Sequence, residues 1–177
     1  GPRGLPLADS SIYLTSATSD KAMKEPSLGT DFSNDYIAEL QAQGLSPDEA
    51  NRKLYERDRE MPEEIEIRLN VYCYVLESGK KLWEEPIYQG HPPGGRHRKN
   101  SFASETPVTD GDNVYVYFTQ IGLFAFDRNG KQAWAAPLPA LPTIRDYGTG
   151  ASPALHGDLI FVLNDNEESS FLAAFDK

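Results

Sequence analysis

The chain has 177 residues, with 17 lysines and arginines against 27 aspartates and glutamates, so its formal net charge at pH 7 is −10. Nucleic-acid-binding proteins generally carry a basic stripe that displaces counterions from phosphates, so no DNA or RNA partner is expected here. The single cysteine, Cys73, excludes an intrachain disulfide and a multi-cysteine metal site. The sequence contains no run of about 18 apolar residues, so no transmembrane helix is predicted.

The first expected strand, Ile12-Tyr13-Leu14, follows a turn-like segment at residues 5–9. Pro6 precedes Trp83 by 77 residues, whereas Pro107 precedes Trp134 by only 27. We therefore interpret residues 18–68 as an insertion.

The later part of this insertion is expected to be helical. Ser46 suits the N-cap, Pro47 suits the first helical position, and Glu49 completes a capping box. A second short helix is expected around residues 35–43. The acidic stretch over residues 56–66 is interpreted as a solvated face, with a partner-facing patch as the alternative.

Two sequence units recur along the rest of the chain. The first pairs a proline with a Gly-Asp turn, and its matched residues are Pro107 with Pro153, Gly111 with Gly157, and Asp112 with Asp158, each 46 positions apart. The second pairs a glycine with a tryptophan, at Gly79 and Trp83 and again 51 positions later at Gly130 and Trp134. A third copy of the second unit begins at residues 173–176.

Each unit predicts two strands, because aromatic and β-branched runs flank a tight turn. Four short strands every 46 to 51 residues match the period of a propeller blade. The fold class expected for residues 1–177 is therefore all-β, an incomplete β-propeller of about three blades with a partly helical insertion at 18–68 in the first. A β-sandwich with coincidental spacing is the alternative.

The segment Ala125-Phe126-Asp127, followed by Gly130 and Trp134, resembles the repeat of pyrroloquinoline-quinone-like (PQQ-like) β-propellers. In that family the tryptophan docks against a neighbouring blade and the glycine turns between the third and fourth strands. The resemblance implies structural docking roles for a set of residues: Trp83, Trp134, Gly79, Gly130, Ala125 and Asp127. The first copy departs from the pattern, with Cys73 in place of the alanine and Val75 in place of the aspartate.

Segments that lead into the first strand of a blade face the central channel in propellers. Their polar residues are therefore candidates for a channel-facing ring: Asn100, Ser104, Glu105, Arg145 and Thr149. The alternative is that these residues join blades through hydrogen bonds. No Ser-His-Asp order, phosphate loop or paired-carboxylate motif occurs, so no catalytic residue is assigned and enzymatic activity stays open, with a non-catalytic role favoured.

Quinone-dependent dehydrogenases of this family hold pyrroloquinoline quinone and calcium in the central funnel, typically beneath an adjacent pair of cysteines that this chain lacks. The oxygen-rich residues 164–168 are interpreted as a turn rather than a Ca²⁺ site. His91 and His97 bracket Pro-Pro-Gly-Gly, and this spacing predicts a flexible basic loop rather than a metal site. An anion or an acidic partner is the alternative ligand of this loop.

The resemblance implies an extracytoplasmic scaffold, periplasmic or membrane-associated, similar to bacterial outer-membrane assembly lipoproteins and without a cofactor. One alternative is the propeller of a quinone-dependent dehydrogenase that binds pyrroloquinoline quinone and calcium. Another is a carbohydrate- or small-molecule-binding propeller without turnover, for which four aromatic residues are available: Tyr13, Tyr88, Tyr117 and Phe118.

Closed propellers have about four to eight blades, and this chain opens without an initiator methionine or a signal-peptide pattern. We therefore expect the chain to be part of a longer protein, or a protein partner to supply the remaining blades.

Overall fold

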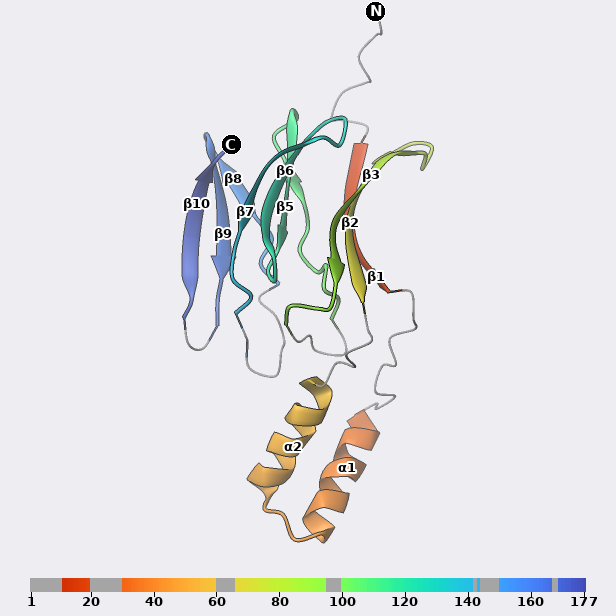
Figure 1. Cartoon of the computed structure of the whole chain (residues 1–177), viewed down its shortest axis with the longest axis vertical. Helices are drawn as coiled ribbons and strands as arrows, with labels where there is room; N and C mark the ends of the chain where they lie inside the picture. The colour runs from red at the N-terminus through yellow and green to blue at the C-terminus, as the bar shows by residue number, and fades with distance from the viewer. Residues whose placement is uncertain are drawn as a thin grey trace, which may run out of the picture.

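A computed structural model describes residues 11–19, 30–59, 66–94, 100–141, 143, 150–166 and 169–177. These residues form three antiparallel sheets and a pair of helices (Figure 1). We call the sheets blades 1, 2 and 3, in chain order.

Each blade is built from strands that follow one another along the chain and pair in that order. Blade 1 contains β1 (Ser11–Ser19), β2 (Ile67–Val75) and β3 (Lys81–Gly90). Blade 2 contains β4 (Val108–Thr109), β5 (Asn113–Phe118), β6 (Gly122–Asp127) and β7 (Gln132–Pro137). Blade 3 contains β8 (Ala154–His156), β9 (Leu159–Asn164) and β10 (Phe171–Asp176).

Strand register shows that the blades are copies of one unit. Tyr13 pairs with Cys73 in blade 1, and Tyr115 pairs with Ala125 at the same place in blade 2. In blade 3 the corresponding pair is Phe161 with Ala174. Strands β1, β5 and β9 are therefore equivalent, and so are β2, β6 and β10.

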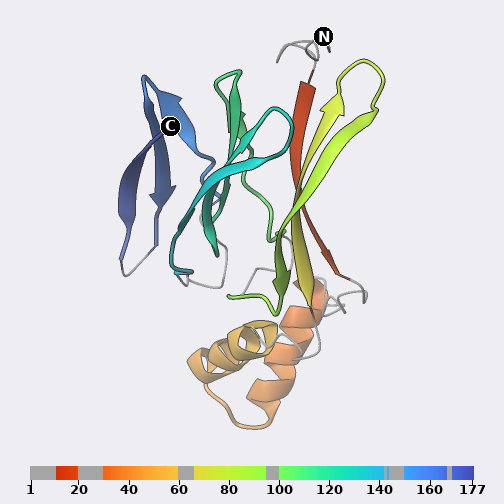
Figure 2. The same ribbon diagram turned by 45° about the horizontal axis from the view of Figure 1, so that its top comes forward.

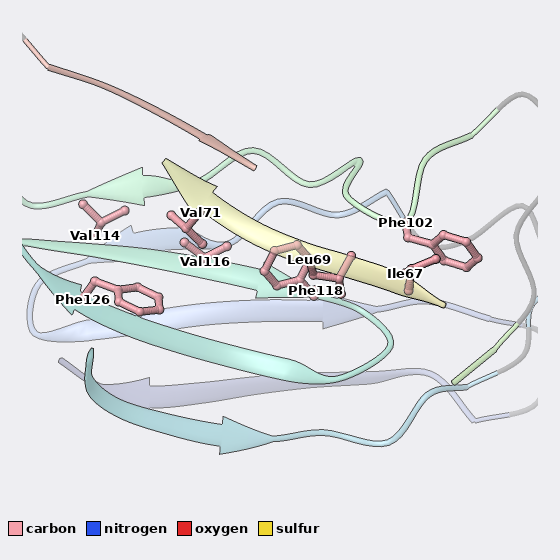
Figure 3. Close-up of a cluster of buried hydrophobic side chains, with 8 residues drawn as sticks. All are labelled: Ile67, Leu69, Val71, Phe102, Val114, Val116, Phe118 and Phe126. Atoms are coloured by element: carbon pink, nitrogen blue, oxygen red, sulfur yellow. The ribbon is translucent and has the colours of Figure 1, made fainter. Parts of the chain in front are cut away.

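The blades pack face to face, and β5 contributes to both interfaces because successive side chains point to opposite faces of a sheet. Val114, Val116 and Phe118 face blade 1 and join a buried cluster (Figure 3). Tyr115 and Tyr117 face blade 3 and join a second buried cluster. A strand that is buried on both faces has a continuous apolar sequence rather than an alternating one. This explains the sequence of β5.

Three antiparallel sheets stacked in chain order, each built from consecutive strands, confirm the prediction of an all-β, incomplete propeller. The first cluster joins blades 1 and 2 and contains Ile67, Leu69, Val71, Phe102, Val114, Val116, Phe118 and Phe126. The second joins blades 2 and 3 and contains Tyr115, Tyr117, Leu123, Ala125, Ile160 and Val162.

Two helices, α1 (Thr30–Ala42) and α2 (Pro47–Arg59), lie between β1 and β2 in the chain. The predicted capping box begins α2: the Ser46 amide and hydroxyl donate to Glu49 Oε2 at 2.9 and 2.6 Å, and the Glu49 amide donates to Ser46 Oγ at 3.3 Å. The first helix begins at Thr30, earlier than the short helix expected around residues 35–43. Neither described helix has the length and apolar character needed to cross a membrane.

The strands that flank the helices are longer than the sequence pattern indicated. Thr18 pairs with Arg68, and Ser19 pairs with Ile67, so these residues belong to the sheet. The segment between the two strands is therefore residues 20–66, within the 18–68 given by the sequence. The helical pair lies beyond the ends of the strands, as both ribbon views show (Figures 1 and 2).

Candidate functional site

The candidate channel-facing residues do not share one environment. Asn100 and Ser104 are exposed in the segment that leads to β4, whereas Glu105 in the same segment is buried. Arg145 and Thr149 lie outside the described residues. The described part of the predicted ring therefore contains one buried carboxyl group and two exposed polar side chains.

Glu105 lies where blades 1 and 2 meet. Its Oε1 accepts a hydrogen bond from the Thr119 amide at 3.4 Å, in the turn between β5 and β6. Its main-chain oxygen accepts one from Thr15 Oγ1 on β1 at 3.3 Å. Burial raises the pKa of the Glu105 carboxyl above its ordinary value, and hydrogen bonds from Thr119 and nearby backbone amides act against this rise.

A second polar contact links blades 2 and 3. Asn164 Nδ2, at the end of β9, donates to the Tyr117 hydroxyl at 3.5 Å, and both side chains are buried. Burial raises the pKa of Tyr117, the bond from Asn164 lowers it, and the charge of Glu105 raises it further. Glu105, Tyr117 and Asn164 thus form a buried polar group near the ends of the strands, which we call the junction group.

Asn164 was not assigned this role from the sequence, although the repeat contains the signal. Its position in β9 corresponds to that of Phe118 in β5, since Phe118 pairs with Gly122 and Asn164 pairs with Phe171. A polar residue therefore replaces a buried aromatic residue at an equivalent place. Buried polar side chains need hydrogen-bond partners, and the Tyr117 hydroxyl supplies one here.

The remaining described residues of the oxygen-rich stretch bond within their own turn. Asp165 Oδ1 accepts from Ser170 Oγ at 2.7 Å, and Asn166 Oδ1 accepts from the Ser169 amide at 2.8 Å. Within the described ranges no group of three or more His, Cys, Asp or Glu side chains could hold a metal ion. His97 lies outside the described residues, and His91 is exposed.

Two residues assigned to docking by resemblance, Trp83 and Gly130, meet at the contact between blades 1 and 2. Trp83 Nε1, on β3 of blade 1, donates to the Arg128 carbonyl oxygen of blade 2 at 2.9 Å. The indole also faces the Phe126 ring, with centroids 6.3 Å apart. A Cβ atom at Gly130 would lie only 2.8 Å from Trp83 Cδ2, so the close approach of the indole requires glycine there. Trp83 thus joins blade 1 to the β6–β7 turn of blade 2.

The other residues of this set lie within blade 2, except for Gly79 in blade 1. Trp134 packs against Tyr115, with ring centroids 6.2 Å apart, beside the cluster between blades 2 and 3. Ala125 is buried in that cluster. Asp127 Oδ1 accepts the amides of Asn129 and Lys131 at 2.8 and 2.9 Å and so holds the turn that contains Gly130. Gly79 has a positive φ of 66° in the equivalent turn of blade 1, and a Cβ there would meet nothing within 4 Å.

The aromatic residues proposed for carbohydrate binding do not form an exposed platform. Tyr117 and Phe118 are buried between blades, and Tyr13 and Tyr88 pack against the cluster between blades 1 and 2. Contacts within the protein therefore cover most of the surface of these rings.

No protein-family model and no curated protein matches this chain. Among solved structures, the chain is similar to a europium-containing methanol dehydrogenase, with 15% sequence identity and a TM-score of 0.41. The similarity covers 66% of this chain but only 21% of the dehydrogenase chain, about a fifth of its length.

Proposed function

We propose that this chain is part of a non-catalytic, PQQ-like β-propeller scaffold located outside the cytoplasm, and that its helical pair binds another protein. The extracytoplasmic location and the PQQ-like family rest on the resemblance of residues 125–134 to the family repeat. The binding role of the helices rests on the length of the connection that contains them.

This proposal rests on a difference in length between equivalent connections in blades 1 and 2. In blade 2, the three residues 119–121 suffice to connect β5 to β6, closed by a bond from the Ile121 amide to the Phe118 carbonyl oxygen. In blade 1, residues 20–66 connect the equivalent strands. Ordering each residue costs roughly 1–2 kcal/mol of backbone entropy, so a folded helical pair that the blade does not require for its connection indicates another use.

The helical pair has a small core of its own. Leu40 of α1 and Ala50 and Leu54 of α2 are buried. Arg57 lies over the Tyr36 ring, 4.0 Å from its centroid, and adds a second contact between the helices. Charged side chains on the outside are exposed, namely Asp35, Glu39, Asp48, Glu49, Arg52, Lys53 and Glu56. A mixed-charge surface of this kind fits recognition of a polar protein surface.

The test replaces residues 20–66 with the three-residue turn Thr-Gln-Ile of blade 2. We expect the β-sheet circular dichroism signal and cooperative unfolding to remain, while a partner identified by crosslinking to the intact chain loses its binding in calorimetry. A charge reversal of Arg52 and Lys53 to Glu serves as the matched variant, because both residues are exposed and the helices should still form. Full binding by the shortened chain would refute the role of the helices, and loss of the fold would show that they belong to the propeller core.

The dehydrogenase alternative predicts a different result. If residues outside the described ranges supply the ligands, the chain should take up pyrroloquinoline quinone and Ca²⁺ in a stoichiometric, saturable way. Absorbance titration of the purified chain with both components distinguishes the two functions. We expect no saturable uptake if the chain is a scaffold, and saturable uptake of both components if it is the propeller of a dehydrogenase.

A further inference from the structure

Asn129 is exposed in the turn between β6 and β7, and the glycine that follows it is buried. In an asparagine-glycine pair the side-chain amide reacts readily with the next backbone nitrogen, because glycine has no side chain to block the approach. Asn129-Gly130 is the one such pair in the sequence. How fast it reacts depends on how the backbone around it is held.

The reaction of such a pair is a hydrolytic deamidation. The Gly130 nitrogen attacks Asn129 Cγ, a new C–N bond forms, and the side-chain nitrogen leaves as ammonia. The intermediate is a cyclic succinimide in which the Gly130 nitrogen carries no hydrogen. Water then opens the ring at either carbonyl carbon, which gives aspartate, or isoaspartate with an extra backbone carbon. Water is the co-reactant, and no electrons are gained or lost.

The closed turn opposes this reaction. The Gly130 amide donates its hydrogen to the Asp127 carbonyl oxygen at 3.0 Å, a bond that the succinimide cannot make because its nitrogen has no hydrogen. Asp127 Oδ1 also accepts the amides of Asn129 and Lys131 at 2.8 and 2.9 Å, so the backbone is held on both sides of the reacting nitrogen. The turn must therefore open before the ring can form.

Blade 1 restrains this turn from outside. Trp83 Nε1 donates at 2.9 Å to the carbonyl oxygen of Arg128, the residue before Asn129. The same indole packs on Gly130, the residue after it, so closely that a Cβ atom there would lie 2.8 Å from Trp83 Cδ2. A side chain of the neighbouring blade thus contacts both residues that flank Asn129. Opening the turn at Gly130 disturbs this contact.

We infer that Asn129 is a deamidation site, and that the contact of Trp83 with the β6–β7 turn protects it while blades 1 and 2 stay packed. A slow reaction of a transiently opened segment follows the population of the open form. The deamidation rate at Asn129 therefore measures how often this contact opens. Isoaspartate lengthens the backbone between residues 129 and 130, which shifts Gly130 relative to the indole and weakens the contact. This inference does not depend on the proposed role of the helical pair.

The test follows the folded chain during incubation in mildly alkaline buffer without denaturant. Digestion before aspartate residues releases the segment that begins at Asp127, and liquid chromatography with mass spectrometry measures its aspartate and isoaspartate forms. Trp83→Phe is expected to raise the deamidation rate roughly fivefold, because the loss of one hydrogen bond increases the open population by about this factor. Asn129→Ser, which copies Ser78 in the equivalent turn of blade 1, is expected to abolish the modification of this segment.

Val162→Ala is the matched control, because Val162 is buried in the cluster between blades 2 and 3 rather than at the Trp83 contact. Circular dichroism checks that each variant folds, and Trp83→Tyr replaces Trp83→Phe if that variant does not. A faster reaction in Trp83→Phe with an unchanged rate in Val162→Ala supports the inference. An unchanged rate in Trp83→Phe, or equal increases in both variants, would overturn it. So would a rate in the folded wild type equal to that of the chain unfolded in urea.

Discussion

Trp83 and Gly130 meet across the boundary between blades 1 and 2, and the indole lies so close to the glycine that a Cβ atom there would be 2.8 Å from Trp83 Cδ2. The indole N–H also donates to the Arg128 carbonyl oxygen at 2.9 Å. The Trp83 side chain of blade 1 thus packs on the turn of blade 2. Substitutions at Gly130 and at Trp83 test this contact.

Gly130→Ala is expected to destabilise the protein more than Gly79→Ala. Both glycines have a positive φ, 85° and 66°, which costs a residue with a Cβ roughly 1–2 kcal/mol. At Gly130 the methyl group also collides with the indole, and such overpacking adds roughly 1–3 kcal/mol. Urea unfolding of the two variants measures the difference. Equal losses of stability would contradict the close approach of Trp83.

Trp83→Ala is expected to lower the free energy of unfolding by ~3–5 kcal/mol, the range for removal of a large packed aromatic side chain. Trp83→Phe keeps most of the ring packing and removes the N–H donor to Arg128, so a loss of about 1 kcal/mol is expected. Chemical denaturation of both variants checks the order. If Trp83→Ala changed stability by less than about 0.5 kcal/mol, as surface substitutions do, Trp83 would not hold the blades together.

Glu105→Gln is expected to remove one component of the pH dependence of stability. Because burial raises the pKa of Glu105 in the folded state, the protonated carboxyl is favoured by folding. Its contribution is fully present below the ordinary carboxyl pKa of 4.5 and is lost as the pH rises through the raised pKa of the folded protein. The amide variant cannot ionise, so the difference in unfolding free energy between wild type and variant should change with pH in this window.

The measurement is urea unfolding at a series of pH values, with Glu39→Gln as the control because that residue is exposed on α1. Parallel pH profiles for wild type and Glu105→Gln would show that the carboxyl is not desolvated in the folded protein.

Asp110→Asn is expected to lower the pKa of Tyr115. Burial and a hydrogen bond to Asp110 Oδ2 at 2.9 Å, together with the charge of that carboxylate, raise the Tyr115 pKa to about 12. The amide removes the charge but leaves the burial, so the pKa should fall without reaching the ordinary 10.0. Ultraviolet titration of tyrosinate measures the shift, and Asp35→Asn on α1 is the control. An unchanged pKa of Tyr115 in the variant would show that Asp110 does not act on the Tyr115 hydroxyl.

Sequence reasoning was strongest where a pattern depends on neighbours in the chain. The Ser46–Glu49 capping box spans three positions and has the expected hydrogen bonds. The repeated turn glycines Gly79 and Gly130 adopt the positive φ that a tight turn between strands requires. The alternation within β5 was less informative, because a strand buried on both faces carries no polar side to show its orientation.

The junction group shows what such reasoning could not reach. Glu105 was one of five candidates for a channel-facing ring, yet its described bonds join it to Thr15 and to Thr119 in two different blades. Its burial depends on how blades 1 and 2 pack, and no local pattern distinguishes it from the exposed Ser104 beside it.

The amino-acid sequence by itself determined the repeat, the strand-and-turn units and the start of the second helix, because hydrogen bonds between residues a few positions apart govern these features. Only the tertiary structure decided which aromatic residues are buried, that Trp83 meets Gly130 rather than its own turn, and that Asn164 bonds Tyr117. Those contacts join residues 47 positions apart in each case. They depend on the packing of one blade against the next, which is a property of whole sheets rather than of any short segment.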